Sequence, residues 1–258
     1  MTTSPATLKP TVLVTGAAHR IGRAIARDLG QHGWTVAVHY HRSDDAAQEL
    51  VSEIHKAGGQ AQCFAADLGN EQQTQDLIPA VTAALGPITA IINNASLFEY
   101  DDLATVSRES WDAHLNTNLR APTVLTQNFV KQLPESQQGN IINIIDQRVW
   151  KLTPHFTSYT LSKAALWTLT QTAAQALAPR IRVNAIGPGP VLPSKRQSDA
   201  QFAQQTKAVP LQRATRLTEI CETVRFILSN DAMTGQMIAL DGGQHLNWQT
   251  PDVSGADE

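Results

Sequence analysis

The sequence predicts an α/β fold: a single doubly wound parallel sheet of the Rossmann type, with helices on both faces. Short apolar runs with strand character alternate along the chain with longer segments of helical periodicity. Gly58-Gly59, Gly86-Pro87 and Pro134 stand where one kind of segment changes to the other. Because parallel strands need crossovers and both faces of such a sheet are buried, this alternation favours a doubly wound sheet, whose ligands bind beyond the carboxyl ends of the strands.

The apolar runs and periodic segments define the expected elements. Strands are expected at 11–14, 35–39, 61–65, 88–93, 140–145, 181–186 and 237–240. Helices are expected at 22–29, 45–56, 71–85, 108–131, 158–178 and 217–228. No stretch resembles a linker between two cores, so we expect one domain over 11–247, a flexible N-terminal tail over 1–10 and a polar C-terminal tail over 248–258.

Composition and charge exclude several classes of function. A net charge of −3 in 258 residues argues against a nucleic-acid binder, which normally carries a basic face. The chain shows neither a signal peptide nor a long apolar run, so we expect no membrane partner. Cys63 and Cys221 are far apart and in no metal-binding spacing, so we expect no metal site and no disulfide framework. A cytoplasmic protein fits these features.

The glycine-rich turn from Thr15 to Gly22 predicts a phosphate site. It follows a short buried-type strand and opens a helical segment, and Gly16 and Gly22 let the backbone come close to a pyrophosphate. Arg20 stands where such a loop ordinarily has its middle glycine, with Ile21 beside it. Its guanidinium would add a positive fork beside the phosphates, although a solvated loop residue is the alternative.

Tyr159 and Lys163 are four residues apart, which places both on one face of a helix. A free tyrosine has a pKa of about 10, and a neighbouring cation favours its ionised form. We therefore expect Lys163 to bring proton transfer by Tyr159 closer to neutral pH, making the tyrosine a usable acid. The alternative is an ordinary solvated helix face.

Several motifs occur in an order that resembles the short-chain dehydrogenase/reductase family. They are Thr15-Gly16 to Gly22, Asp67-Leu68, Asn93-Asn94-Ala95, Asn118, Tyr159 with Lys163, Pro188-Gly189, 234–236 and Asp241-Gly242-Gly243. The resemblance implies that Asp67 and Leu68 lie against the adenine, and that Asn94 and Ala95 lie against a ribose. It also implies that Lys163 holds the nicotinamide ribose, that Asn118 supports a proton-relay water, and that Ser96, Pro188 and Gly189 complete the cofactor site.

The strand before Tyr159 ends in Asp146, where this family usually has a serine. A serine hydroxyl suits a ketone oxygen, whereas a carboxyl beside the tyrosine can relay a proton towards a ring nitrogen. The substrate is therefore expected to contain an imine. Alternatively Asp146 is a turn or cap residue, and Ser158 or Thr157 supplies a hydroxyl.

Three departures together resemble the pteridine reductase branch of the family, which includes bacterial dihydromonapterin reductases. They are Arg20, Asp146, and the run Asn94-Ala95-Ser96 followed by Phe98. The resemblance implies a flat pterin between the nicotinamide and the Phe98 ring, with Ser96 and Arg20 bonding its polar edge, and Pro190 nearby. Phe98 could instead be an ordinary apolar loop residue.

The end of the second strand predicts NADPH as the cofactor. His39-Tyr40-His41-Arg42-Ser43 contains no acidic residue to hold the ribose hydroxyls of NAD. Tyr40, His41, Arg42 and Ser43 instead offer a cation and hydroxyls to a 2′-phosphate, and the stretch resembles pteridine reductases. We expect Asp44 and Asp45, which follow at once, to cap the next helix.

These features lead us to expect an NADPH-dependent reductase of a dihydropterin C=N bond, whose catalytic residues are Asp146, Tyr159, Lys163 and Asn118. One rival is reduction of a ketone, such as a 3-oxoacyl thioester or a sugar. A second is a non-catalytic NADP-binding redox sensor. The resemblance also implies a homotetramer, formed through the helices expected at 108–131 and 158–178. The segment after Pro190 is short and polar and fits a bulky lipid chain poorly.

Overall fold

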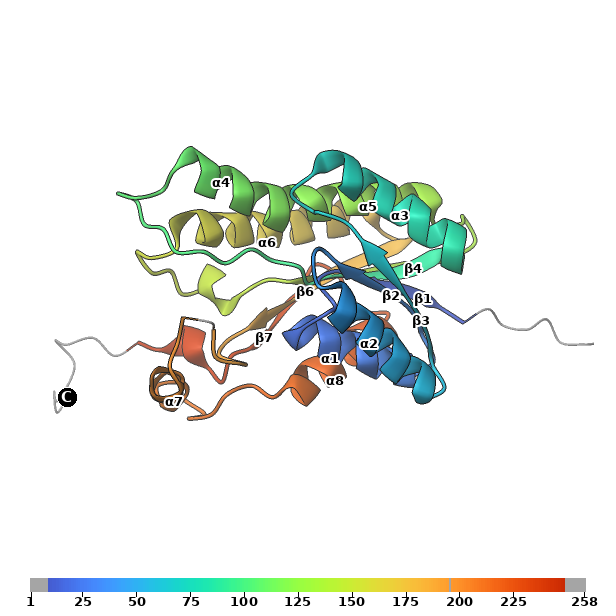
Figure 1. Cartoon of the computed structure of the whole chain (residues 1–258). Coiled ribbons are helices and arrows are strands. Elements are labelled where there is room, and N and C mark those ends of the chain that lie inside the picture. Colours follow the sequence, from blue (N-terminus) through green and yellow to red (C-terminus); the bar gives the residue numbers. More distant parts are fainter. Residues whose placement is uncertain (1–8, 195, 249–258) are drawn as a thin grey trace, which may run out of the picture.

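The computed structural model describes residues 9–194 and 196–248 and contains one parallel sheet of seven strands (Figure 1). The strand order is β3-β2-β1-β4-β5-β6-β7, so the direction of winding reverses between β1 and β4. The strands are β1 (Thr11–Val14), β2 (Thr35–Tyr40), β3 (Gln60–Ala65), β4 (Ile88–Asn93), β5 (Gly139–Ile144), β6 (Ile181–Pro188) and β7 (Met237–Leu240). This confirms the predicted doubly wound architecture.

Helices cover both faces of the sheet (Figure 1). One layer consists of α1 (Arg20–Gln31), α2 (Asp44–Lys56) and α8 (Leu217–Ser229). The other consists of α3 (Glu71–Leu85), α4 (Arg108–Leu115), α5 (Ala121–Gln132) and α6 (Thr157–Leu177). Two apolar clusters fill the spaces between these layers and the sheet, and the central strands contribute fully buried side chains to both. Burial on both faces explains why the strands read as continuous apolar runs rather than as alternating patterns.

Two helical features differ from the expectation. The segment expected as one helix over 108–131 contains a π-helical turn, Asn116–Arg120, between α4 and α5. The polar segment after Pro190 contains an additional helix, α7 (Asp199–Lys207), which begins at a capping box of Ser198 and Gln201. None of the residues of α7 is buried in the described structure. Its sequence therefore shows no apolar periodicity from which the helix could be predicted. Most of the two expected tails lies outside the described residues.

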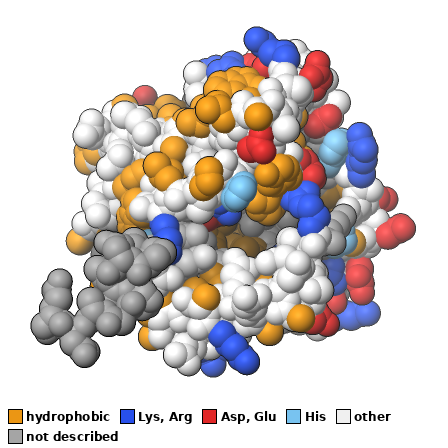
Figure 2. Space-filling view, turned by 90° about the vertical axis from the view of Figure 1, so that its left-hand side faces the viewer, with side chains coloured by type: hydrophobic (Ala, Val, Ile, Leu, Met, Phe, Trp, Pro, Cys, Tyr) orange, Lys and Arg blue, Asp and Glu red, His pale blue; other side chains and the backbone are white. Residues whose placement is uncertain are grey.

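The carboxyl ends of the strands meet at one end of the molecule, which is visibly hollowed (Figure 2). Apolar side chains line this hollow, and cationic side chains stand at its rim (Figure 2). The hollow lies where open α/β sheets bind ligands. Among the described helices, none is both long and apolar enough to cross a membrane.

Candidate active site

A cavity of about 1150 Å³ occupies this end of the sheet. Single-ligand pockets usually measure about 300–1,000 Å³, so this cavity is large enough for a dinucleotide together with a small substrate. Most predicted site residues line it: Gly16, Arg20, Ile21, Gly22, His41, Asp67, Leu68, Asn94, Ala95, Ser96, Phe98, Asp146, Tyr159, Lys163, Pro188, Gly189 and Pro190. Four predicted residues are not part of the described lining: Tyr40, Arg42, Ser43 and Asn118. No group of three or more metal-ligating side chains is found in the described residues.

The glycine turn fits a pyrophosphate. A Cβ added at Gly22 would lie 2.4 Å from the Gly16 carbonyl oxygen and 2.5 Å from Asn94 Nδ2, so only glycine fits there. Asn94 Nδ2 donates to the carbonyl oxygens of Thr15 (2.8 Å) and Gly16 (3.2 Å), which braces the turn. The His19 side chain makes no capping bond to a described residue, so backbone N–H groups at the start of α1 are available to an anion.

His39 supports this turn from inside the protein, and the sequence analysis assigned it no role. Its Nδ1 accepts a hydrogen bond from the Gly16 N–H (3.0 Å), so its Nε2 donates to the Ala66 carbonyl oxygen (3.0 Å). Burial lowers the pKa of His39 to about 4. A neutral imidazole therefore holds the glycine turn at physiological pH. In the sequence this histidine is one residue of an apolar strand, which gave no signal of its position.

The residues after β2 are arranged differently from the expectation. Asp44 and Asp45 are the first residues of α2 and Ser43 occupies its N-cap position, so the prediction that the two aspartates cap the helix is wrong. Their charges still favour the positive end of the helix dipole. The neighbouring Asp44 carboxylate, together with partial burial, raises the pKa of the Tyr40 phenol to about 12. The 2′-phosphate role of this stretch stays a prediction.

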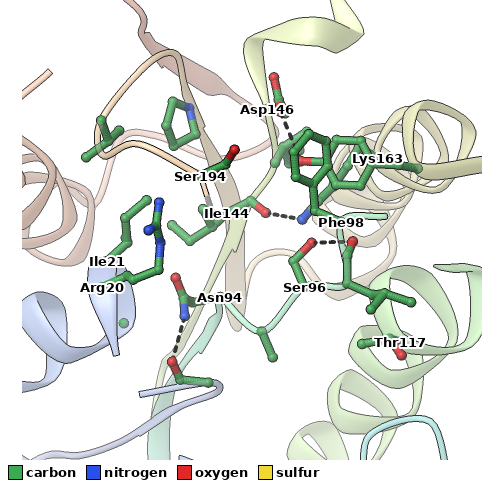
Figure 3. Close-up of a pocket in the computed structure, with 18 of the residues that line it drawn as sticks. Arg20, Ile21, Asn94, Ser96, Phe98, Thr117, Ile144, Asp146, Lys163 and Ser194 are labelled. Carbon is green, nitrogen blue, oxygen red and sulfur yellow. Dashed lines mark hydrogen bonds between the residues drawn. The ribbon is translucent and has the colours of Figure 1, made fainter. Parts of the chain in front are cut away.

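Arg20 joins two loops at the edge of the cavity. Its guanidinium donates to the carbonyl oxygens of Pro193 (2.9 Å) and Leu192 (3.1 Å), in the segment after β6. Its backbone φ of +53° lies in the left-handed region that favours glycine, which agrees with its place in a glycine-type turn. Arg20 and Asn94 stand on the same side of the pocket, opposite Asp146 and Lys163 (Figure 3).

Three of the four catalytic residues expected from the sequence, Asp146, Tyr159 and Lys163, lie together in the cavity, where Figure 3 shows Asp146 and Lys163 on the same side. Tyr159 Oη donates to Asp146 Oδ2 (2.9 Å), and Lys163 Nζ donates to the Ile144 carbonyl oxygen (2.8 Å). Asp146 Oδ1 accepts from the Arg148 N–H (2.8 Å) and so caps the short helix Gln147–Val149. Asp146 therefore serves both as a cap and as the partner of Tyr159.

Burial dominates the protonation of this group. It raises the pKa of Asp146, and together with the Asp146 charge it raises the pKa of Tyr159 well above its ordinary value. It lowers the pKa of Lys163 to about 8. The prediction that Lys163 lowers the pKa of Tyr159 is therefore wrong for this structure, because the ammonium bonds a backbone carbonyl while Asp146 accepts from the phenol. Tyr159 is a neutral phenol that holds its proton.

Asn118 is hydrogen-bonded to three residues of the protein, and its support of a relay water stays a prediction. Its Nδ2 donates to the Leu97 carbonyl oxygen (3.0 Å) and to Ser162 Oγ (3.0 Å). Its Oδ1 accepts from the Leu97 N–H (2.8 Å) and from Ser96 Oγ (3.3 Å). Both amide donors and the amide oxygen are thus bonded within the protein. Asn118, in the π-helical turn, holds the segment that carries Ser96 and Phe98.

Phe98 belongs to an aromatic cluster beside the tyrosine. Its ring stacks on Phe156 with centroids 4.5 Å apart and meets Tyr159 edge-on at 4.6 Å. The Arg196 guanidinium lies 5.3 Å from the Phe98 ring centroid and pairs with Glu99 at 2.5 Å. The ring is therefore part of the cavity wall beside the catalytic hydroxyl.

Asp101, which lies in a distant segment, caps helix α6, the helix that carries Tyr159 and Lys163. This role was not predicted from the sequence. Phe156 occupies the N-cap position of α6 and has no side chain capable of capping. Asp101 Oδ1 instead accepts from the Ser158 N–H (3.1 Å), and Oδ2 accepts from the hydroxyls of Ser158 and Ser110. Because the Ser158 hydroxyl is buried in this network, it is not available to a substrate carbonyl.

Comparisons with known proteins agree with this site. Residues 16–245 match the sequence family described as enoyl-(acyl carrier protein) reductase. A 3-oxoacyl-(acyl carrier protein) reductase of Staphylococcus epidermidis is 32% identical over 93% of this chain and 100% of its own length. A short-chain type dehydrogenase/reductase of Picea abies is 30% identical over 90% of this chain and 91% of its own length. The chain belongs to the short-chain dehydrogenase/reductase family.

Within that family, one solved structure is much more similar. The FolM alternative dihydrofolate reductase 1 of Brucella suis, determined in complex with NADP, is 51% identical. The similarity covers 94% of this chain and 98% of the other, with a TM-score of 0.92. The chain is thus similar to a dihydrofolate reductase of this fold as well as, more distantly, to carbonyl reductases.

Proposed function

We propose that this protein is an NADPH-dependent reductase of the C=N bond of a dihydropterin, giving the tetrahydropterin. The hydrogen bond between Tyr159 and Asp146 carries this proposal, because it puts a carboxyl where a ketone reductase of the family usually has a serine hydroxyl. The similarity to an NADP-bound FolM alternative dihydrofolate reductase supports both the substrate class and the cofactor.

Different residues of the cavity have different roles in this reaction. The glycine turn and the start of α1 hold the pyrophosphate, and Lys163 holds the nicotinamide ribose. NADPH, when bound, supplies the hydride. Tyr159 gives its proton to the ring nitrogen, the protonated form of Asp146 returns a proton to the phenolate through their hydrogen bond, and a water then reprotonates Asp146. Phe98, Ser96 and Arg20 position the pterin against the cofactor.

The function is tested by following NADPH oxidation with dihydromonapterin, dihydrobiopterin, dihydrofolate and an acetoacetyl thioester. We expect turnover of the pterins. Turnover of the thioester alone would identify a carbonyl reductase, which is the function of the Staphylococcus relative. Binding of NADPH without turnover of any substrate would favour a redox sensor.

Replacing Asp146 by serine should weaken pterin reduction. The Asp146→Ser variant loses the carboxyl that supplies protons to Tyr159, and general acid–base groups of this kind contribute about 10²–10⁴-fold. In the wild type, kcat should fall as the pH rises through the raised pKa of Asp146, because the protonated carboxyl disappears. This part of the pH profile of kcat should be absent from the variant. Unchanged rates would remove Asp146 from the mechanism.

We propose a homotetramer in the cytoplasm. The helices α4 and α6 support the tetramer, since they expose Trp111 and Leu161 respectively. Sedimentation equilibrium would test the assembly, and a monomer at assay concentration would contradict it. Cell fractionation would test the location.

A further inference from the structure

Arginine side chains line the cavity at several points, and two of them are bonded to other loops. Arg20 donates to the carbonyl oxygens of Leu192 and Pro193. Arg196 pairs with Glu99 at 2.5 Å and donates to the Phe98 carbonyl oxygen at 2.6 Å. The third, Arg148, has no carboxylate partner within residues 9–194 and 196–248.

The few bonds that Arg148 makes leave part of its guanidinium unsatisfied. Its Nη1 donates to Thr153 Oγ1 at 2.5 Å. Its Nε is buried and has no hydrogen-bond partner among the described residues. Burying an N–H donor without a partner is unfavourable, and buried guanidinium groups are normally paired. The Nη2 group makes no hydrogen bond to a described residue and is not among the buried unpaired atoms, so it is the donor that a ligand in the cavity can reach.

Arg148 lies at the substrate end of the cavity. Its backbone N–H holds Asp146, and its guanidinium is 5.2 Å from the ring centroid of Phe156, which stacks on Phe98. The glycine turn and the 2′-phosphate region belong to other elements, β1–α1 and the end of β2. The free cation therefore adjoins the place proposed for the pterin. The carboxylate of Asp146, close by in the same segment, already accepts hydrogen bonds from Tyr159 and from the Arg148 N–H.

We propose that Arg148 binds a carboxylate on the side chain of the substrate. This rests on the proposed function and makes it more specific: the preferred substrate is a dihydropterin with an acidic aryl side chain, of the dihydrofolate type. A guanidinium beside aromatic rings suits such a side chain, because it pairs with the carboxylate while Phe156 and Phe98 contact the aryl group. A dihydropterin with an uncharged side chain leaves Arg148 unpaired.

The test compares KM for dihydrofolate and dihydrobiopterin in the wild type, Arg148→Gln and Arg148→Lys. The glutamine variant should raise KM for dihydrofolate about tenfold more than KM for dihydrobiopterin, a difference of about 1.4 kcal/mol. The lysine variant should recover part of this loss. Dihydrobiopterin accounts for any effect of the lost charge on Asp146. Arg108→Gln, an exposed arginine on α4 that pairs with Asp112, is the matched control and should change neither KM.

A binding measurement separates recognition from catalysis. The fragment p-aminobenzoyl-glutamate should bind the NADP-loaded wild type and lose about tenfold affinity in Arg148→Gln. Equal changes of KM for both pterins, or equal fragment affinity, would overturn the role of Arg148 and leave the proposed function standing. Wild-type turnover of dihydrobiopterin without dihydrofolate would do the same. Turnover of no dihydropterin, dihydromonapterin included, would overturn the proposed function and this inference together.

Discussion

Replacing Tyr159 by phenylalanine should lower kcat for dihydropterin reduction by about 10²–10⁴-fold, the contribution usual for a positioned general acid. The variant keeps the ring, which is buried and packs edge-on against Phe98, and loses only the hydroxyl that bonds Asp146. The Asp146 carboxyl should stay in place, because its Oδ1 still accepts from the Arg148 N–H.

Steady-state kinetics at saturating NADPH measure this effect, and a fluorescence titration measures the affinity for NADPH. The affinity should change little, since the glycine turn and Lys163 are untouched. A thermal unfolding midpoint close to that of the wild type excludes misfolding as the cause. A kcat within threefold of the wild type would show that the proton comes from another group.

Replacing Asp101 by alanine should lower the free energy of unfolding by about 2–4 kcal/mol, the range for losing one partner of a buried charged network. The substitution removes the acceptor of the Ser158 N–H and of the Ser110 and Ser158 hydroxyls. It also removes the negative charge at the start of α6, which carries Tyr159 and Lys163.

Urea unfolding at one fixed protein concentration measures the loss as a lower midpoint with an unchanged slope. The neighbouring Asp102→Ala is the control. Its carboxylate accepts from the Ala104 and Thr105 N–H groups in an exposed turn, so its loss should lower the free energy of unfolding clearly less than the loss of Asp101. An equal loss of unfolding free energy in the two variants would show that capping of α6 by Asp101 contributes no more to stability than the exposed turn at Asp102.

The features that could be predicted are those encoded locally. The strands are runs of apolar residues buried on both faces, and their limits differ from the predicted ones by at most two residues. Gly22 had to be glycine because its Cβ would strike the Gly16 carbonyl oxygen, and that constraint is visible as a motif. The spacing of Tyr159 and Lys163 likewise places both on one helix face without knowledge of the rest of the fold.

The features that escaped prediction either depend on contacts between distant segments or lack a clear local signal. Asp101 precedes the residue it caps by 57 positions, and no local rule connects an aspartate to a helix so far along the chain. The helix α7 has no buried face, so it lacked the periodic signal by which the other helices were found. Asp44 and Asp45, which were expected to cap α2, are instead its first two residues, because Ser43 occupies the N-cap position.

By itself the sequence determined the order of the strands and of the helices that have a buried face, the glycine turn, and the placement of Tyr159 and Lys163 on one helix face, because each follows from nearest neighbours and helical or strand periodicity. Only the tertiary structure decided how those groups ionise and which arginine stays free. Burial opposes charge, so it keeps Tyr159 and His39 neutral, and it does so through neighbours that the fold brings together from separate segments. In the same way Arg20 bonds carbonyl oxygens and Arg196 pairs with a carboxylate across the cavity. Arg148 has no carboxylate partner among the described residues, and its Nε has no hydrogen-bond partner there.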